Sequence, residues 1–497
     1  MRPLFAATLG MLLASFAVAT LPNRVLVLIL MTVGILLLAV IPPAGSYKRV
    51  AIIIGAVLGV LAVGLHPIAN ADMPNTLPTD IIGDLCSPIR RGQTSLRFIV
   101  CTSTGKYAIR TNTEKSLSYL DRVRVISEFS VPEPPRNIGE FDYQRWCRLH
   151  HIVAVSAAAS NVILLETRTN IVGRFISEVR TWIDTRCHSG LPADTAPLAS
   201  GILLSITDDL PFELQESFGR TGTVHVLSTS GMHISVLVAT VGTILVWSGR
   251  TGSAGVSLGL SILVGYASGG GPAPLRAVTS LVARLMARLL SRAPEPWHLV
   301  CLCACAAMLR DPFVVMDAGA QLSFLAVCGL IVAAPFADLF GERIRQSPSV
   351  VLKVALTLLQ GFTVSFIVTL VTAPAVAFHM QHLSLISPVA NIPVGFLSEW
   401  ALLIGAAAVT IGDIPIVGKL IWTLLNGVLQ SLIFVANILA DVPFADVATG
   451  VANPYVVVVA SVGLVGGFAL LGRKLCGSSF ASQPQYYIPW SPSKPLT

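Results

Sequence analysis

Charged residues are scarce in this chain of 497 residues: they make up 12%, against 54% hydrophobic residues, and the mean hydropathy is +0.75. Soluble domains carry about a quarter charged residues, so this composition excludes an ordinary soluble protein. Apolar runs of roughly 17 or more residues recur, each long enough to cross about 30 Å of hydrocarbon as a helix. We therefore expect a polytopic α-helical membrane protein with about 10–12 spans, some of them broken or re-entrant.

The chain also lacks the short motifs of several enzyme classes. It has no GxxxxGK[ST] loop for nucleotide phosphates, so any ATP-driven step belongs to a partner. No cysteine spacing fits a zinc site, and we expect neither a metal nor a cofactor. The absence of a GxSxG elbow leaves an intramembrane hydrolase built on Ser230 and His233 as a minor alternative. The expectation is a protein that is not an enzyme.

Changes in composition and hydrophobic pattern divide the chain into five parts. These are three N-terminal spans (1–70), a strand-rich domain (75–165), an amphipathic helix (168–190), the main membrane domain (195–472) and a tail (473–497). The tail and the long polar stretch are the parts that must lie in water, on one side of the membrane or the other.

Basic residues in short loops give the orientation, because such loops favour the cytoplasm. Lys48 and Arg49 lie between the second and third expected spans, and Arg473 and Lys474 follow the last one. We therefore expect a multi-pass protein of the cytoplasmic (inner) membrane with a cytoplasmic tail and an extracytoplasmic strand-rich domain.

The strand-rich domain shows short alternating segments, among them SLRFIVCTST, GKYAIRTNT and DRVRVISEFSV, with turn residues between them. About eighty residues of this kind suit a small β-barrel of five or so strands, and an OB-fold is one candidate. Disulfides form outside the cytoplasm. Cys86–Cys101 is the pair we favour, because one hairpin can bring both residues together.

Positive charge is dense in this domain. Its basic residues include Arg90, Arg91, Arg97, Lys106, Arg110, Lys115, Arg122 and Arg124, and its interleaved aromatics include Phe98 and Tyr107. A basic groove with aromatic platforms suits single-stranded DNA. Strand alternation favours the alternative, in which the arginines form a solvated face and the aromatics form the core. Both interpretations stay open here.

The expected membrane domain contains polar residues, and Gly and Pro interruptions of its helices, at positions where both cost free energy in lipid. HVLSTSGMHISVL opens it with His225 and His233, and Gly and Pro interrupt later runs in GYASGGGPAPLRA, LVTAPAVAF and LISPVANIPVG. Broken helices at membrane depth are tolerated where they are buried in protein or line a wet cavity. The pattern therefore predicts a path through the membrane, although an interhelical hydrogen bond explains Gln321 equally well.

Taken in order, these segments resemble the ComEC family of competence membrane channels. The resemblance rests on HVLSTSGMHISVL, GPAPLRAVTSLVARL, LRDPFVVMDAGAQLSFLAVCGL and HLSLISPVANIPV, and on FDYQRWCRLHHI before them. It implies an extracytoplasmic OB-fold domain followed by a multi-helix domain that conducts one DNA strand into the cytoplasm during natural transformation.

The resemblance also implies which residues line the path. They are His225, Ser230, Gly231, His233, Arg276, Asp311, Pro312, Gln321, Ser323, Pro388 and Asn391, and it assigns none of them a catalytic role. Two features depart from the family pattern. No HxHxDH motif is present, so we expect a short form without a C-terminal metallo-β-lactamase-like domain, and PAPLRA has no serine directly before the arginine.

The partners follow from the same resemblance. They are single-stranded DNA, the lipid membrane, a DNA receptor outside, and a motor ATPase and single-strand-binding proteins inside, with a separate nuclease. Two other functions remain open at this point besides the hydrolase. One is a small-solute or lipid transporter with an accessory barrel, and the other is a relative without transport activity.

Overall fold

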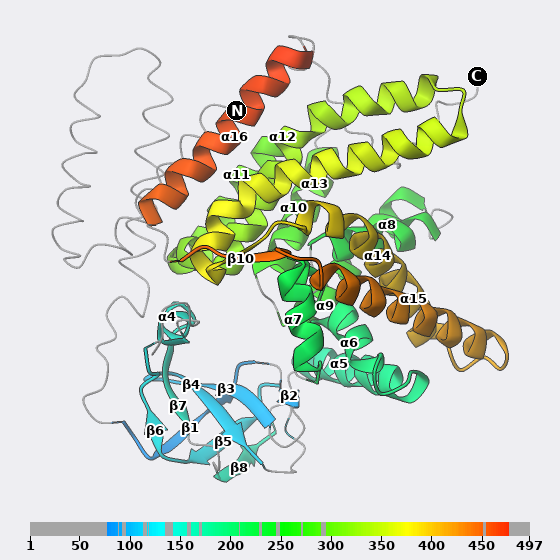
Figure 1. Ribbon diagram of the computed structural model, residues 1–497. Helices are drawn as coiled ribbons and strands as arrows, with labels where there is room; N and C mark the ends of the chain where they lie inside the picture. The colour runs from blue at the N-terminus through cyan, green and yellow to red at the C-terminus, as the bar shows by residue number, and fades with distance from the viewer. Residues whose placement is uncertain are drawn as a thin grey trace.

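The fold is taken from a computed structural model (Figure 1). It describes residues 77–87, 89–91, 96–112, 117, 119–134, 143–156, 161–167, 171–207, 209–227, 231–244, 249–269, 272–289, 295–450 and 454–476. The three expected N-terminal spans, most of the tail, Lys115 and Ser230 lie outside the described residues.

The strand-rich domain forms a mixed sheet, drawn in blue and cyan in Figure 1. Its strands are β1 (Asp80–Leu85), β2 (Arg90–Arg91), β3 (Leu96–Thr102), β4 (Gly105–Thr111), β5 (Arg122–Ile126), β6 (Phe129–Ser130), β7 (Ile152–Ser156) and β8 (Asn161–Glu166). They pair in the order β6-β7-β4-β3-β1-β5-β8, with β2 added beside β3. The described pairing leaves β6 and β8 as ends, so the OB-fold barrel stays a prediction.

The core of the sheet domain corrects one expectation. Phe98 and Tyr107 are only 3% and 1% exposed and pack together with Leu85, Val100 and other apolar residues. They are therefore not stacking platforms, because strand alternation turns them inward while their neighbours Arg97 and Lys106 face the other side. A disulfide joins Cys86 to Cys101, the pair favoured from the sequence.

Helices make up the membrane domain. The sheet domain contributes α4 (Tyr143–Leu149), and the membrane domain is preceded by α5 (Ile171–Gly190) and opens with the short helices α6 (Ala196–Leu204), α7 (Phe212–Arg220) and η1 (Val224–Leu227). The bundle continues with α8 (Gly231–Ile244), α9 (Gly249–Ala267), α10 (Pro272–Leu289), α11 (Pro296–Arg310), η3 (Pro312–Met316), α12 (Ala318–Gln346), α13 (Val350–Met380), α14 (Ser387–Ile411), α15 (Val417–Ala440) and α16 (Pro454–Cys476).

Four of these helices, α12 to α15, are long and apolar enough to cross a membrane. They form two antiparallel pairs in contact, α12 with α13 and α14 with α15 (Figure 1). Their apolar surfaces stay largely outside the packed interior, with Val351 79% exposed and Phe434 65% exposed. Exposure of this kind suits contact with lipid, so the protein is a helical membrane protein.

The predicted helix breaks hold at the glycine-rich stretch and just before Pro388, where α14 begins, and fail at Pro374. The glycine-rich stretch after Ala267 does separate α9 from α10. Pro374 and Pro393, by contrast, lie inside the continuous helices α13 and α14. A proline removes one backbone hydrogen bond but keeps a φ angle that a helix accepts, and packed neighbours in a bundle can satisfy the freed carbonyl.

The amphipathic helix α5 lies along the bundle. Ile176 and Ile183 pack against the core around α6, while Phe175 and Trp182 are 53% and 46% exposed. Arg180 donates hydrogen bonds to the carbonyl oxygens of Leu204 and Ala267, near the C-terminal ends of α6 and α9. A cation there complements the carbonyls that a helix end leaves unpaired.

A small clasp closes one end of the bundle. β9 (His382–Ser384), between α13 and α14, pairs with β10 (Asp446–Ala448), between α15 and α16. The Nδ1 atom of His382 lies 2.7 Å from a carboxylate oxygen of Asp446. The clasp therefore holds the two helix pairs together at this end.

Candidate nucleic-acid interface and membrane path

A row of arginines crosses the sheet domain on neighbouring strands. In the β2-β3-β4 register, Arg90 lies opposite Arg97, and Arg97 lies opposite Arg110. Arg97 and Arg110 are exposed. Like charges directly opposite each other are unfavourable in a sheet unless other groups compensate them. This set is called the arginine row below.

The arginines of β5 are in a different situation. Arg124 forms a bidentate pair with Asp80, with N···O distances of 2.5–3.0 Å. Arg122 lies opposite Asp84 in the β1–β5 register. Acidic residues therefore already face these two arginines of β5.

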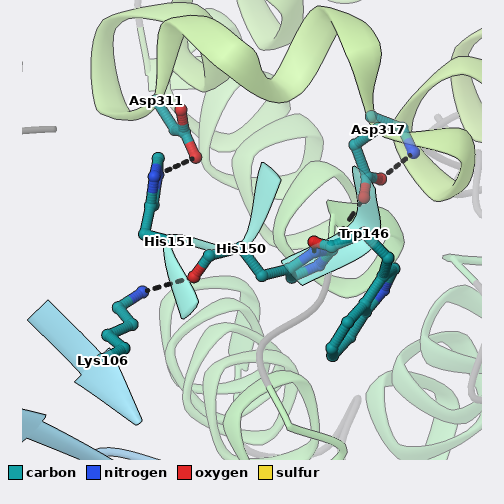
Figure 2. A network of polar contacts seen from close by, with 7 residues as sticks. Lys106, Trp146, His150, His151, Asp311 and Asp317 are labelled. Carbon is teal, nitrogen blue, oxygen red and sulfur yellow. Dashed lines mark hydrogen bonds and ion pairs between the residues drawn. The ribbon is translucent and has the colours of Figure 1, made fainter. Parts of the chain in front are cut away.

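Lys106 lies where the sheet domain meets the membrane domain. Its Nζ atom donates to the carbonyl oxygen of His150, 3.3 Å away, just after α4 (Figure 2). Burial lowers the pKa of the Lys106 ammonium, while the charge of Asp311 opposes that shift. The lysine is thus a half-buried cation at the junction.

Two histidines of the sheet domain face two aspartates of the membrane domain (Figure 2). The Nε2 atom of His151 lies 3.2 Å from Oδ2 of Asp311, and that of His150 lies 3.7 Å from Oδ2 of Asp317. The side chain of His151 is only 8% exposed, so the first pair is well shielded from water. These contacts join the β7 side of the sheet domain to the segment before α12.

Each aspartate also caps the start of a helix. Oδ1 of Asp311 accepts from the backbone N–H of Phe313 at the start of η3, and Oδ1 of Asp317 accepts from that of Ala320 at the start of α12. Carboxylates at such positions satisfy the unpaired N–H groups of the first turn. Asp311 therefore caps η3 and also contacts the sheet domain.

Inside the bundle, three family motifs meet at one arginine. The Nε atom of Arg276 on α10 donates to Oγ of Ser323 on α12, 2.8 Å away. A Cβ atom added to Gly231 on α8 would lie 2.9 Å from a terminal nitrogen of Arg276. The guanidinium therefore lies close against α8 at Gly231, among apolar helices, and a larger side chain there would displace the flexible end of Arg276.

Gln321 continues this polar region towards the junction. Its Nε2 atom donates to the carbonyl oxygen of Val315, and its Oε1 atom lies 2.9 Å from Nε2 of His379 at the end of α13. Next to His379, the guanidinium carbon of Arg145 lies 5.2 Å from the centre of the Phe378 ring. Gln321 therefore makes an interhelical hydrogen bond, one of the two explanations that the sequence left open.

A second polar group lies at the start of α14. The side-chain amide of Asn391 donates to Oγ of Ser365 and Oγ of Ser387, 3.1 and 3.3 Å away. Among the described residues, Oδ1 of Asn391 and Oγ of the buried Ser384 have no hydrogen-bond partner. Pro388 occupies the first turn of α14. This end of α14 thus keeps neutral polar groups for water or a ligand.

The histidines of the opening motif flank the entry to α8. His233 is 1% exposed on α8, while His225 lies in η1 and is exposed, and the two are close enough to interact electrostatically. Ser230 lies outside the described residues, so the hydrolase alternative stays a prediction. No group of three or more metal-ligating side chains occurs in the described part of the chain.

The structure thus gathers Gly231, Arg276 and Ser323 in one cluster, with Gln321 two residues away along α12. Asp311 lies at the junction instead, and Asn391 belongs to the separate group at α14. Sequence reasoning missed His150, His151 and Asp317, although FDYQRWCRLHHI and the run after LRDP were quoted for the resemblance. Only the fold shows that these two runs touch.

Residues 202–474 match the model of the Competence protein family. The chain belongs to that family. The match includes every membrane motif from His225 to Asn391, and the sheet domain with α4 lies before it. The membrane motifs noted in the sequence therefore all lie inside the matched region.

Two curated proteins are similar to the chain. ComE operon protein 3 of Bacillus subtilis (strain 168) is 25% identical over 272 residues, which is 54% of this chain and 33% of that protein. The uncharacterized protein YcaI of Escherichia coli (strain K12) is 24% identical over 205 residues, 39% of this chain and 26% of that protein. The match thus spans about a third or less of either relative. No solved structure matches the chain significantly.

Proposed function

We propose that this chain conducts a single strand of DNA across the cytoplasmic membrane during natural transformation. Membership of the Competence protein family supports a role in DNA uptake. The observation that carries the proposal is the Arg276–Ser323 pair among apolar helices, with Gly231 close beside it. A buried charge in such a bundle is expensive and marks a functional position.

The chemistry around Arg276 suits a moving polyanion. DNA phosphates cannot cross hydrocarbon bare, so they need a wet and mildly positive path. One fixed cation attracts a phosphate, and the neutral donors Ser323 and Asn391 can pass it on without holding it tightly. A site that binds too strongly would stop conduction, so few cations and many neutral groups favour transport.

The sheet domain is the receiving end in this proposal. Its arginine row supplies the sequence-independent attraction that single-stranded DNA needs. Basic residues at the opposite end of the long helix pair, namely Arg343, Arg345 and Lys353 around the α12–α13 turn, favour a cytoplasmic location for that end. The junction and the sheet domain then lie outside the cytoplasm.

The work of pulling and cutting DNA belongs to other proteins in this scheme. A receptor outside, a motor ATPase and single-strand-binding proteins inside, and a separate nuclease complete it. The chain itself acts as a channel and performs no reaction.

Proteoliposomes containing the full chain test the proposal. We expect them to take up labelled single-stranded DNA faster than duplex DNA, and to leave a small anionic dye outside. Arg276→Gln should reduce uptake by about ten- to a hundredfold, since a hydrogen bond to a charged group contributes about 1.5–3 kcal/mol. Arg284→Gln is the matched control, because Arg284 is an exposed arginine on the same helix.

Other results would contradict the proposal. Passage of the dye with exclusion of DNA would indicate a small-solute transporter. Labelling of Ser230 by a serine-directed covalent probe would favour the hydrolase. Failure to restore transformation in a competent strain that lacks its own family member, at normal protein levels, would argue for a relative without transport activity.

A further inference from the structure

Three aromatic rings on α4 and just after it stack on one another. The ring centres of Tyr143 and Trp146 are 5.7 Å apart with an interplanar angle of 12°, and those of Trp146 and His150 are 4.3 Å apart at 25°. Residues three and four apart share one face of a helix, so the rings form a continuous column. We call Tyr143, Trp146 and His150 the stacking ladder.

The ladder is not the part of α4 that holds it to the sheet domain. Cys147 is the buried residue of this helix. Tyr143, in contrast, is 38% exposed, the side chain of His150 is 36% exposed and Trp146 is half-buried. Large aromatic surface left in water next to a junction is typical of a binding site for planar groups.

Two cations lie near the ladder. Lys106 donates to the backbone carbonyl of His150. Arg97 is close enough to Tyr143 to act on it electrostatically, whereas Arg145 lies over the ring of Phe378. Burial raises the pKa of Tyr143 to about 12, and the nearby positive charge of Arg97 acts in the opposite direction. The phenol therefore stays neutral at physiological pH and does not repel an anion.

We propose that the stacking ladder is a binding site for the bases of single-stranded DNA, with the nearby cations on its phosphates. The inference rests on the proposed function and names the residues that would hand the strand from the sheet domain to the membrane domain. Base–aromatic stacking tolerates any sequence because every base has a flat π-face, which a general DNA-uptake route requires.

The position of the ladder supports this role. Its outer end, Tyr143, lies near Arg97 of the arginine row. Its inner end, His150, faces Asp317, the residue that caps α12 (Figure 2). The first turns of α12 carry Gln321 and Ser323. A strand that follows the rings therefore moves from the arginine row towards the Arg276 cluster.

Binding of two labelled oligomers to the purified full chain tests the inference. One is oligodeoxythymidine of about 20 nucleotides, longer than the roughly 4–16 nucleotides that a single small domain covers. The other is an abasic strand of equal length and charge. Trp146→Leu and Tyr143→Leu should each weaken binding of oligodeoxythymidine by about tenfold and leave binding of the abasic strand unchanged.

Two variants serve as controls. Trp146→Phe keeps a ring and should bind oligodeoxythymidine nearly as well as the unchanged protein. Trp182→Leu removes an exposed tryptophan from α5 and should change neither affinity. Because Tyr143 is the outermost ring, Tyr143→Leu gives a second reading if Trp146→Leu fails to fold.

The outcomes separate the ladder from the channel. Equal loss for both oligomers, or no loss in Tyr143→Leu and Trp146→Leu, would overturn the ladder even if the chain still conducts DNA. A normal protein that binds neither oligomer would overturn the ladder and remove support from the proposed function as well. Selective loss of oligodeoxythymidine binding without loss of DNA conduction would establish the site and show that conduction does not depend on it.

Discussion

The sheet domain and the membrane bundle handle positive charge in opposite ways. The sheet domain displays the exposed arginines Arg97 and Arg110 side by side on neighbouring strands, in contact with water and salt. The bundle keeps Arg276 partly buried and bonded to Ser323, with other neutral polar groups nearby. Many exposed cations favour capture of a polyanion from solution, whereas one shielded cation favours passage.

The two regions are also held together differently. The sheet domain has a small apolar core and a covalent link between Cys86 and Cys101. The bundle relies on close contacts between glycine and small residues, such as Gly222, in the turn after α7, against Ser384 and Ser387. Disruption of each region should therefore need a different kind of substitution.

The largest effect is expected from the disulfide. Cys86→Ser with Cys101→Ser should lower the free energy of unfolding of the sheet domain by about 3 kcal/mol, because the bond closes a loop 15 residues long. Hydrogen exchange of the full chain should show faster exchange in β1 to β5 and unchanged exchange in α12 to α15. Faster exchange throughout the bundle would mean that the two regions do not unfold separately.

Substitutions at two glycines, Gly222 and Gly219, test how close packing stabilises the bundle. Gly222 has φ = +69°, and a Cβ atom there would lie 2.9 Å from the Cβ atoms of Ser384 and Ser387. Gly222→Ala should therefore cost about 2 kcal/mol through backbone strain and overpacking. Gly219→Ala, with no atom within 4 Å of the added Cβ, should stabilise α7 by about 0.5–1 kcal/mol.

Thermal unfolding of the two variants in detergent gives the comparison. The melting temperature should fall for Gly222→Ala and rise slightly for Gly219→Ala, while the sheet domain keeps its hydrogen-exchange pattern. Equal melting temperatures would show that the contact between Gly222 and the serines does not limit the stability of the bundle.

Much of the architecture could be predicted from the sequence because it depends on local patterns. Long apolar runs predicted the helices from α8 to α16, and alternating segments predicted β3, β4 and β5. Prolines were harder to interpret, since Pro374 and Pro393 remain within helices once packing supports the backbone. The sequence pattern alone does not show which neighbouring helices will pack around a proline.

The junction could not be predicted at all. His151 and Asp311 are 160 positions apart, and neither residue type indicates its partner. The same limit applies to the arginine row, because the strand register that aligns Arg90, Arg97 and Arg110 appears only in the folded sheet. Alternation alone did, however, favour a buried location for Phe98 and Tyr107.

The junction itself offers a smaller and more selective test. Asp317→Ala removes both the cap of α12 and the partner of His150, and should cost about 1 kcal/mol. Asp317→Asn keeps an oxygen that can cap the helix but loses the charge that faces His150. Hydrogen exchange at the first turn of α12 should therefore rise in the alanine variant and stay low in the asparagine variant.

The same two variants can also be tested through the distance between the sheet domain and the membrane domain. A spin-label distance between the sheet domain and α13 should broaden in both Asp317 variants, because both lose the charge pair. A change confined to the alanine variant would assign the whole effect to the cap and none to His150.

The smallest effect concerns the paired arginine of β5. The hydrogen bond from Arg124 holds the pKa of the Asp80 carboxyl below its ordinary value of 3.8. A depressed pKa in the folded state stabilises that state at pH values above the ordinary value, and the contribution is lost as the pH falls through and below about 4. We expect exchange in β1 and β5 to rise slightly more steeply on acidification in the normal protein than in Asp80→Asn. Identical pH profiles would show that this exposed ion pair does not contribute to the stability of the sheet. The arginines of β5 would then differ from the arginine row only in having acidic neighbours.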